Sequence, residues 1–411
     1  MRTSLLLLIT LVLLSSCGKK TTVLQGDGDT LAFKYAQRLT VVRYPGYTVA
    51  TLQNPWRTDA VLHQYVLVPS DSTLPDVLPH GTLLRTPLRR SVVFTTVHCS
   101  LLSMLHREES VAGVADLKYI KAPYVIEGVR SGRITDCGDG MSPVIEKIID
   151  MQPDALLLSP FENSGGYGKL EEIDIPIVEC AEYMELTPLG RAEWMRFYGM
   201  LYGCEREADS LFAVVDSSYH ALKDMASSMP RQSVVLDKVT GSVWYVPGGR
   251  STIGQMLVDA GGDYPWASDE HSGSVSLPFE TVLERAGECN LWLFRFSSDH
   301  DITYAELRGE HHGYDRFKAF RNRQVYGCNV ELSMFYEESP FRPDYLLGDF
   351  LKILHPDIPN LPSLRYYRKL NHSTFASSAC SVSLGARGKE QENSWINTEK
   401  KGSESTRNRK R

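Results

Sequence analysis

The segment from Glu205 to about Ser228 constrains the fold of this 411-residue chain more than any other. Apolar side chains recur in it every three or four residues, which is the period of an α-helix with one buried face. They are Ala208, Leu211, Phe212, Val215, Tyr219, Leu222 and Met225. Such a helix is roughly 35 Å long, about the diameter of a small domain, and Pro230 ends it. We therefore expect one long helix to join two parts of the chain.

Strands and helices alternate on both sides of this predicted helix. Before it, apolar strands are predicted at 91–94, 155–158 and 175–178, and helices at 98–107, 143–151 and 187–203. After it, strands are predicted at 233–236, 243–246, 291–294 and 324–326, and helices at 252–260, 278–286 and 343–354. Continuous apolar strands between helices indicate parallel sheets that are covered on both faces. The pattern predicts two α/β halves.

Residues 33–68 have a different pattern. Segments 38–42, 48–52 and 64–68 read as strands, and Tyr44-Pro45-Gly46-Tyr47 reads as a turn, so an antiparallel β segment is expected here. The predicted fold class is thus α/β, with two lobes joined by a single long helix and an N-terminal antiparallel β segment. The expected division is a signal peptide (1–16), a linker (17–30), an N-terminal lobe (31–186), connecting and backbone helices (187–229), a C-terminal lobe (230–370) and a disordered basic tail (371–411).

The N-terminus predicts the compartment. Met1 and Arg2 precede an apolar run from Leu5 to Leu14, which is shorter than the ~20 residues that span a bilayer and has the form of a signal-peptide core. Leu14-Ser15-Ser16-Cys17 looks like the lipobox of bacterial lipoproteins, in which the Cys carries the lipid. An ordinary secretory signal is the alternative. Cys17 is the expected lipidation site, and the lack of an acidic cluster after it favours a lipid-anchored protein facing the periplasm.

The charge distribution excludes one class of partner. Without Arg2 and residues 372–411, the chain has 35 basic and 46 acidic residues, a net charge of −11, whereas residues 372–411 have eight basic and four acidic residues. An acidic body argues against nucleic acid as a partner, because nucleic-acid binding depends on Lys and Arg at phosphates. The Cys residues other than Cys17 show no C-x-x-C pairing or zinc spacing, and most are expected to be buried small side chains.

Several motifs occur in order between residues 90 and 357. They are Val111-Ala112-Gly113-Val114, Ser142-Pro143-Val144-Ile145-Glu146 with Pro153-Asp154, Trp244-Tyr245-Val246-Pro247-Gly248-Gly249, Leu257-Val258-Asp259-Ala260-Gly261-Gly262, Phe341-Arg342-Pro343-Asp344 and His355-Pro356. This set resembles the helical-backbone (class III) periplasmic substrate-binding proteins of iron-complex and cobalamin ABC importers, in the lipoprotein type of Bacteroidetes-like bacteria. The resemblance implies two Rossmann-like lobes, a ligand cleft between them, little hinge motion, a monomer and an ABC permease as partner.

The two halves share a sequence pattern that places one acidic residue at the same position in each. Residues 142–146 and 277–280 each open a helix that leads into a buried strand, and Glu146 and Glu280 stand in the first turns of these helices. The resemblance implies that both carboxylates dock on Arg residues of the permease. The alternative is that the helix dipole alone favours an acid there, by about 0.3–1 kcal/mol.

The ligand cleft is expected at the loops that follow the carboxyl ends of the strands, where open α/β sheets bind ligands. The candidate cleft residues are Thr96, His98, Tyr119, Tyr167, Trp244, Tyr245 and Arg295. Aromatic groups with a few polar ones suit a corrin, porphyrin or catecholate chelate, and Arg295 could meet an anionic group. His98, Tyr119 and Tyr167 are conceivable ligands of the bound metal, although packing roles are the alternative for each. No resident metal or other cofactor is predicted, because the metal complex is the cargo.

Three functions compete with capture of an iron complex (siderophore or haem) or cobalamin. A receptor for bare Zn²⁺ or Mn²⁺ needs about four convergent His, Asp or Glu ligands, and His98 is the one His at a predicted cleft loop. An envelope enzyme lacks support, because no nucleophile elbow, zinc-protease helix motif or P-loop is present. A capture protein that works without a permease stays open. We expect a binding protein and not an enzyme.

Overall fold

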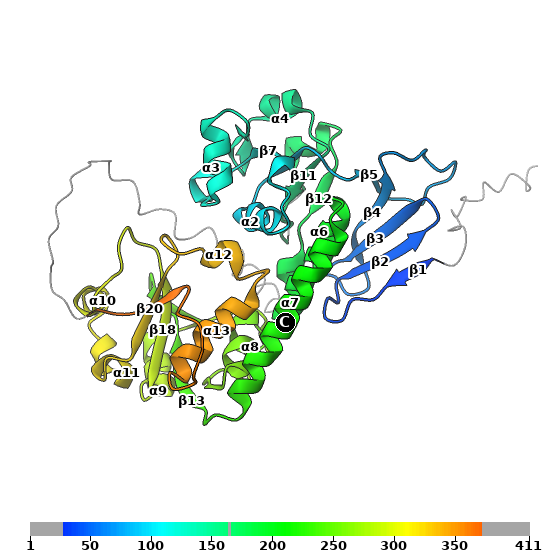
Figure 1. The fold of residues 1–411 in the computed structure, drawn as a ribbon. Coiled ribbons are helices and arrows are strands. Elements are labelled where there is room, and N and C mark those ends of the chain that lie inside the picture. Colours follow the sequence, from blue (N-terminus) through cyan, green and yellow to red (C-terminus); the bar gives the residue numbers. More distant parts are fainter. Residues whose placement is uncertain (1–27, 163–165, 372–411) are drawn as a thin grey trace, which may run out of the picture.

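The structure is a computed structural model that describes residues 28–162 and 166–371 (Figure 1). The predicted signal peptide, Cys17, most of the linker and nearly all of the basic tail lie outside these residues. Within the described part, no helix is both long enough and apolar enough to cross a membrane.

The long helix predicted from the sequence is α7 (Glu205–Ser227), and it runs between the two lobes in Figure 1. Its buried residues are Ala208, Phe212, Val215, Tyr219 and Ala226. They follow the helical period because one face of the helix packs on the protein core while the opposite face meets water. Met225, which the period also assigned to this face, is 46% exposed.

The connection before α7 is two helices and not the single one predicted. Helices α5 (Pro188–Glu193) and α6 (Met195–Leu201) meet at the fully buried Trp194. The start of α5 was predictable, because the Thr187 hydroxyl caps the helix by accepting from the Gly190 amide at 2.9 Å and Pro188 occupies its first turn.

The N-terminal lobe contains a five-stranded parallel sheet in the order β12-β11-β6-β7-β8, with a two-stranded hairpin beside it. Its strands are β6 (Ser91–Val93), β7 (Val111–Val114), β8 (Thr135–Asp136), β11 (Ala155–Leu158) and β12 (Ile177–Glu179), and the hairpin is β9 (Gly138–Asp139) and β10 (Ser142–Pro143). The helices are α2 (Thr96–Met104), α3 (Pro123–Arg130) and α4 (Ile145–Met151), with 3₁₀ helices η1 (Glu108–Ser110), η2 (Leu117–Tyr119), η3 (Gly168–Glu172) and η4 (Glu182–Met184).

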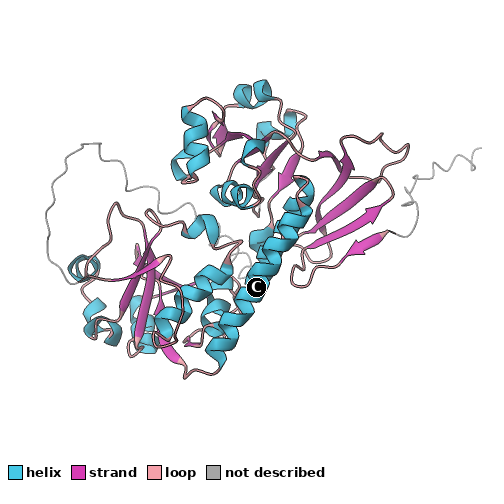
Figure 2. Ribbon diagram, viewed as in Figure 1, coloured by secondary structure: helices cyan, strands magenta, loops and turns pink. Residues whose placement is uncertain are grey.

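The C-terminal lobe repeats this architecture with the strand order β16-β13-β18-β19-β20. The strands are β13 (Gln232–Leu236), β16 (Gly262–Asp263), β18 (Leu291–Phe296), β19 (Val325–Asn329) and β20 (Tyr367–Lys369), and β20 alone among them pairs antiparallel. The helices are α8 (Thr252–Asp259), α9 (Phe279–Ala286), α10 (Tyr304–Glu310), α11 (Lys318–Arg321), α12 (Phe335–Glu338) and α13 (Pro343–Leu354), with the 3₁₀ helix η5 (Tyr314–Arg316). Figure 2 shows helices on both sides of the strands in the two lobes.

One predicted strand of this lobe belongs to a different sheet. Residues 243–246 lie in β15 (Val243–Pro247), which forms a small antiparallel sheet with β14 (Val239–Thr240) and β17 (Ser274–Leu277). The strand–helix alternation did not reveal this, because β15 is a short apolar run like those of the parallel sheet.

The N-terminal β segment is a sheet of its own, formed by β1 (Asp29–Leu31), β2 (Leu39–Tyr44), β3 (Tyr47–Gln53), β4 (Val61–Pro69) and β5 (Thr82–Thr86). The three predicted strands are β2, β3 and β4, which pair antiparallel, whereas β4 and β5 pair parallel. Two buried carboxylates hold the segment between β1 and β2. Glu193 accepts from the amides of residues 34–36, and Glu185 accepts from those of residues 37–38 and from the Trp194 indole.

Candidate functional site

The carboxyl edges of the two parallel sheets meet between the lobes. Thr96, just after β6, donates its hydroxyl to Glu337 Oε1 at 3.3 Å, and Glu337 lies on α12, just after β19. Lys121, after β7, donates its ammonium to the carbonyls of Val330 and Ser333, also after β19. Ligands of open α/β sheets bind outside the carboxyl ends of strands. Thr96 therefore lies in the predicted region, and Lys121 and Glu337 are interlobe residues that the sequence analysis missed.

His98 is not at an open surface, because its side chain is 1% exposed. Its Nε2 lies 2.9 Å from the Tyr198 hydroxyl and 3.4 Å from Glu182 Oε1, and Tyr198 donates to the other Glu182 oxygen at 2.9 Å. Burial alone would lower the pKa of His98, but the adjacent Cys180 and Glu182 side chains raise it to about 10. The charged His98 in turn lowers the pKa of Glu182 to about 2, although burial alone would raise it. This geometry assigns His98 to a buried ion pair and not to a metal complex.

Trp244 is a second correction. It is fully buried in β15, its indole N–H donates to the Leu236 carbonyl at 2.8 Å, and its ring packs on Trp292 and Phe317. Because its ring is fully buried among side chains of the C-terminal lobe and its N–H is already bonded, Trp244 is a core residue. Tyr245, the next residue in β15, points to the opposite side of the strand and is half-buried opposite Ser276.

Arg295 lies at the carboxyl end of β18, as predicted, but its charge is already paired. Its Nε and Nη2 donate to the two carboxylate oxygens of Asp237 at 3.1 and 2.7 Å, and Phe335 of α12 lies 5.9 Å from the guanidinium. Burial alone would lower the pKa of Arg295, but Asp237 raises it above the usual value. A bidentate pair of this kind leaves little net positive charge for an anionic ligand.

The remaining two candidates in the N-terminal lobe differ in position. Tyr119 in η2 is partly exposed, and the Lys118 ammonium lies 4.8 Å from the centre of its ring. Tyr167 instead packs on an apolar cluster that includes Val92 of β6 and Leu156 of β11, and it donates its hydroxyl to Glu179 at 3.1 Å. Tyr119 therefore stays a candidate cleft residue, whereas Tyr167 has a packing role.

Glu146 and Glu280 occupy equivalent positions. Each is an exposed residue in the first turn of its helix, α4 or α9, where the helix dipole favours a negative charge. The surface around Glu146 is apolar, with Val144 and Ile149 exposed on the same helix region and Met141 80% exposed on the adjacent hairpin.

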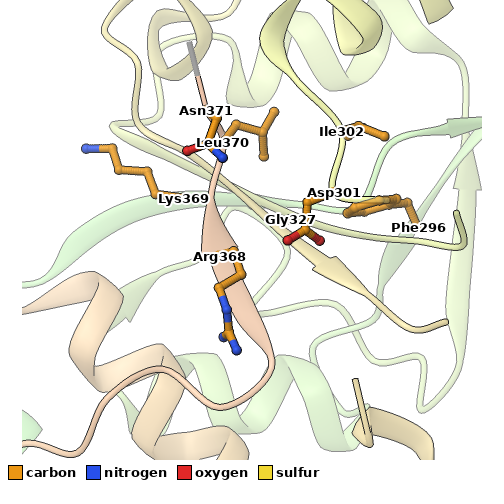
Figure 3. Close-up of a pocket in the computed structure, with 8 residues that line it drawn as sticks. All are labelled: Phe296, Asp301, Ile302, Gly327, Arg368, Lys369, Leu370 and Asn371. Atoms are coloured by element: carbon orange, nitrogen blue, oxygen red, sulfur yellow. The ribbon is translucent and has the colours of Figure 1, made fainter. Parts of the chain in front are cut away.

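Two cavities are too small for a metal chelate. One of about 220 Å³ lies between the lobes and is lined by Ser100, Ser103, Met104, Ala122, Pro123, Met334 and Glu338. The other, of about 160 Å³, lies at the edge of the C-terminal lobe, where Phe296, Asp301, Ile302 and Gly327 face residues 368–371 (Figure 3). Pockets for drug-sized ligands have volumes of about 300–1,000 Å³. Across residues 28–162 and 166–371, no group of three or more His, Cys, Asp or Glu side chains is arranged to hold a metal ion.

Comparison with known proteins identifies the family. The family model described as periplasmic binding protein matches residues 93–332, which is more than half of the chain. The chain belongs to this periplasmic binding protein family. The family is one of binding proteins, and the matched residues run from the end of β6 to the turn before α12.

One relative and two solved structures are similar to this chain over about two thirds of its length or more. An uncharacterized lipoprotein of Methanocaldococcus jannaschii is 24% identical over 364 residues, which cover 83% of this chain and 86% of the relative. A periplasmic haem-binding protein from Pseudomonas aeruginosa has a TM-score of 0.53 at 14% identity, with 71% of this chain and 100% of that chain covered. A possible iron-binding, periplasmic solute-binding protein from Staphylococcus epidermidis has a TM-score of 0.52 at 17% identity, with 66% and 100% covered. The predicted α/β fold of two lobes is thereby confirmed.

Proposed function

We propose that this chain is a lipid-anchored, monomeric substrate-binding protein that captures an iron complex (a ferric siderophore or haem) or alternatively cobalamin between its lobes and delivers it to the permease of an ABC importer. The family supports the binding function, and structural neighbours named for haem and iron binding support the class of cargo. The motif at Cys17 and the lipoprotein among the relatives support a lipid anchor in the periplasm.

The observation that carries the proposal is the contact between Thr96 and Glu337. It joins a residue after β6 to a residue after β19, so the carboxyl edges of the two parallel sheets face each other across the interlobe space. Each edge supplies backbone groups and loop side chains to one side of a shared site. A ligand held there would contact both lobes, and its binding would fix the distance between the exposed Glu146 and Glu280 that we propose for permease docking.

The charges at this edge favour a cargo of low net charge. On the C-terminal lobe, Asp237 neutralises Arg295. On the N-terminal lobe, Lys118 lies 3.9 Å from Asp139, with both side chains about half exposed. A strongly anionic ferric catecholate would find little unpaired positive charge at these two positions, whereas a neutral ferric hydroxamate would not need it. Among siderophores we therefore propose hydroxamates ahead of catecholates.

The test is a titration of the protein lacking residues 1–17, followed by intrinsic fluorescence and by the visible spectrum of the ligand. The panel is haemin, cyanocobalamin, a ferric hydroxamate, a ferric catecholate and free Zn²⁺. We expect saturable one-to-one binding of one chelate that weakens at least about tenfold, or about 1.4 kcal/mol, in the Tyr119→Ala and Tyr245→Ala variants. The control is Tyr44→Ala on the N-terminal sheet. Binding of Zn²⁺ alone, or no binding across the panel, would contradict the proposal.

A further inference from the structure

Residues 330–341 lie between β19 and α13, and Glu338 among them accepts from Arg365 and Tyr366 of the C-terminal lobe. The same segment also contacts the rest of the protein at three places. Lys121 contacts its start, Thr96 contacts Glu337 in its middle, and His98 lies against Phe341 at its end. In Figure 1, α12, which is part of this segment, lies next to α2 of the N-terminal lobe. We call residues 330–341 the strap.

The end of the strap at Phe341 is a firm attachment. Phe341 is fully buried, and its ring packs edge-on against the rings of His98 and Tyr198, with centroids 6.0 Å away in each case. Burial of a Phe side chain is worth about 1.5–3 kcal/mol. Because Tyr198 belongs to α6, next to the helix that joins the lobes, a strap anchored here keeps this end in place when the lobes separate.

The start of the strap presents two backbone carbonyls to a cation. The Ser333 hydroxyl donates to the Asn329 carbonyl at 2.8 Å, and the Asn329 amide donates to the Ser298 and His300 carbonyls at 2.9 and 3.0 Å. These bonds fix a turn whose Val330 and Ser333 carbonyls both accept from the Lys121 ammonium of the opposite lobe. The Lys121 side chain is 27% exposed, so water can compete for these contacts.

In the closed arrangement of the two lobes, only one carboxylate oxygen of Glu337 has a hydrogen-bond partner among the described residues. Its carboxylate is almost fully buried at the interface, with Oε1 3.3 Å from the Thr96 hydroxyl and 3.8 Å from the Lys121 ammonium. Its Oε2 has no hydrogen-bond partner among the described residues. A buried carboxylate oxygen without a partner costs free energy, and water would satisfy it if the lobes moved apart. Glu337 therefore has a reason to separate from the N-terminal lobe that Phe341 does not.

We propose that the strap closes one end of the interlobe cleft and that Lys121 holds it shut. The strap pivots at Phe341, and cargo enters and leaves after the Lys121 contacts break. The interlobe cavity of about 220 Å³ beside α12 agrees with this, because it is too small for a metal chelate until the strap moves. The cargo step rests on the proposed function, whereas the closed strap is a property of the chain without ligand.

The experiment is hydrogen–deuterium exchange of the ligand-free protein, comparing Lys121→Met with Lys118→Met. Lys118 is the matched control because it lies in the same connection after β7 but contacts only residues of its own lobe, Tyr119 and Asp139, in the contacts described above. In Lys121→Met we expect amides 330–338 to exchange at least about tenfold faster, which is about 1.4 kcal/mol. Amides around Phe341 and in β6 and β7 should keep the wild-type rate, as should the strap in Lys118→Met.

Two results would overturn the strap proposal. Equal exchange of residues 330–338 in Lys121→Met and in the wild type would show that Lys121 does not hold the strap. Faster exchange that extends through Phe341 and into β6, both in Lys121→Met and in the milder Thr96→Val, which removes only one hydroxyl, would show general loosening and no pivot. Release of a bound ferric hydroxamate should also quicken in Lys121→Met. If exchange responds but no chelate in the panel binds, the strap stands and the proposed function fails.

Discussion

His98 and Glu182 form an ion pair, with His98 Nε2 3.4 Å from Glu182 Oε1, and both side chains are at most 3% exposed. The Tyr198 hydroxyl lies within 2.9 Å of both groups. The pair joins α2, which follows the first strand of the N-terminal lobe, to η4, which precedes the helices that lead to the other lobe. The pair therefore links α2, at the interlobe edge, to the segment that leads to α7.

Removing one partner of this pair should be costly. A lone charge left in a buried site typically destabilises a protein by about 3–5 kcal/mol, so we expect His98→Leu to lower the free energy of unfolding by that amount in urea denaturation. The double variant His98→Leu/Glu182→Leu should lose clearly less than the sum of the single variants. Additive losses would show that the two groups are not coupled.

The same pair sets a pH window. The pKa of Glu182 is lowered to about 2, so its stabilisation is present above its ordinary value of 4.5 and is lost as the pH falls from 4.5 towards 2. The pKa of His98 is raised to about 10, so its stabilisation is complete below 6.5 and is lost as the pH rises towards 10. The contribution of the pair to the free energy of unfolding should peak between about pH 4.5 and 6.5, and His98→Leu should abolish this dependence.

Glu179 should have the opposite effect on pH dependence. Burial raises its pKa to about 6, although the Tyr167 hydroxyl bond lowers it, and its Oε2 has no hydrogen-bond partner among the described residues. Because the folded pKa exceeds the ordinary 4.5, stability should fall by about 2 kcal/mol as the pH rises from 4.5 through 6. Glu179→Gln should remove this loss and be more stable than the wild type at pH 7.5 but not at pH 4. Glu172→Gln, at an exposed position nearby, is the control in thermal melts at both pH values.

Glu193 should be essential for the attachment of the N-terminal sheet. Its buried carboxylate accepts from the amides of Lys34, Tyr35 and Ala36 at 2.7–2.9 Å. Glu193→Ala would leave these donors without their partner, at about 1–3 kcal/mol for each buried group. We expect a loss of about 3–5 kcal/mol together with rapid hydrogen exchange at residues 34–38. Glu207→Ala, at an exposed site on α7, is the matched control, and slow exchange at 34–38 in Glu193→Ala would contradict this role.

The fold was predictable where periodicity decides it. The buried face of α7 and the fully buried strand β11 follow directly from apolar residues spaced for a helix or run together in a strand. Trp244 shows where the pattern was misread, because side chains alternate along β15 and the fully buried Val246 indicates that Trp244 points into the core while Tyr245 points the other way.

The candidate site was less predictable, because its contacts join residues far apart in the chain. Asp237, which neutralises Arg295, lies 58 positions away, and Val330, which accepts from Lys121, lies 209 positions away. No local pattern encodes such a pairing; only the packing of two lobes across α7 creates it. The exposed positions of Glu146 and Glu280, in contrast, follow from their place in the first turns of two equivalent helices.

Charge reversal at these two glutamates tests delivery separately from capture. Because both side chains are exposed, replacing them costs only the helix-dipole contribution of about 0.3–1 kcal/mol each, and the fold and the chelate affinity should be unchanged. In cells that depend on this protein for its cargo, Glu146→Arg/Glu280→Arg should reduce uptake at least about tenfold, because two charge-assisted contacts become repulsive. The matched control is Asp150→Arg/Glu284→Arg, which makes the same charge change at exposed positions of α4 and α9. Normal uptake by the glutamate variant would contradict permease docking at these residues and favour a capture protein that works without a permease.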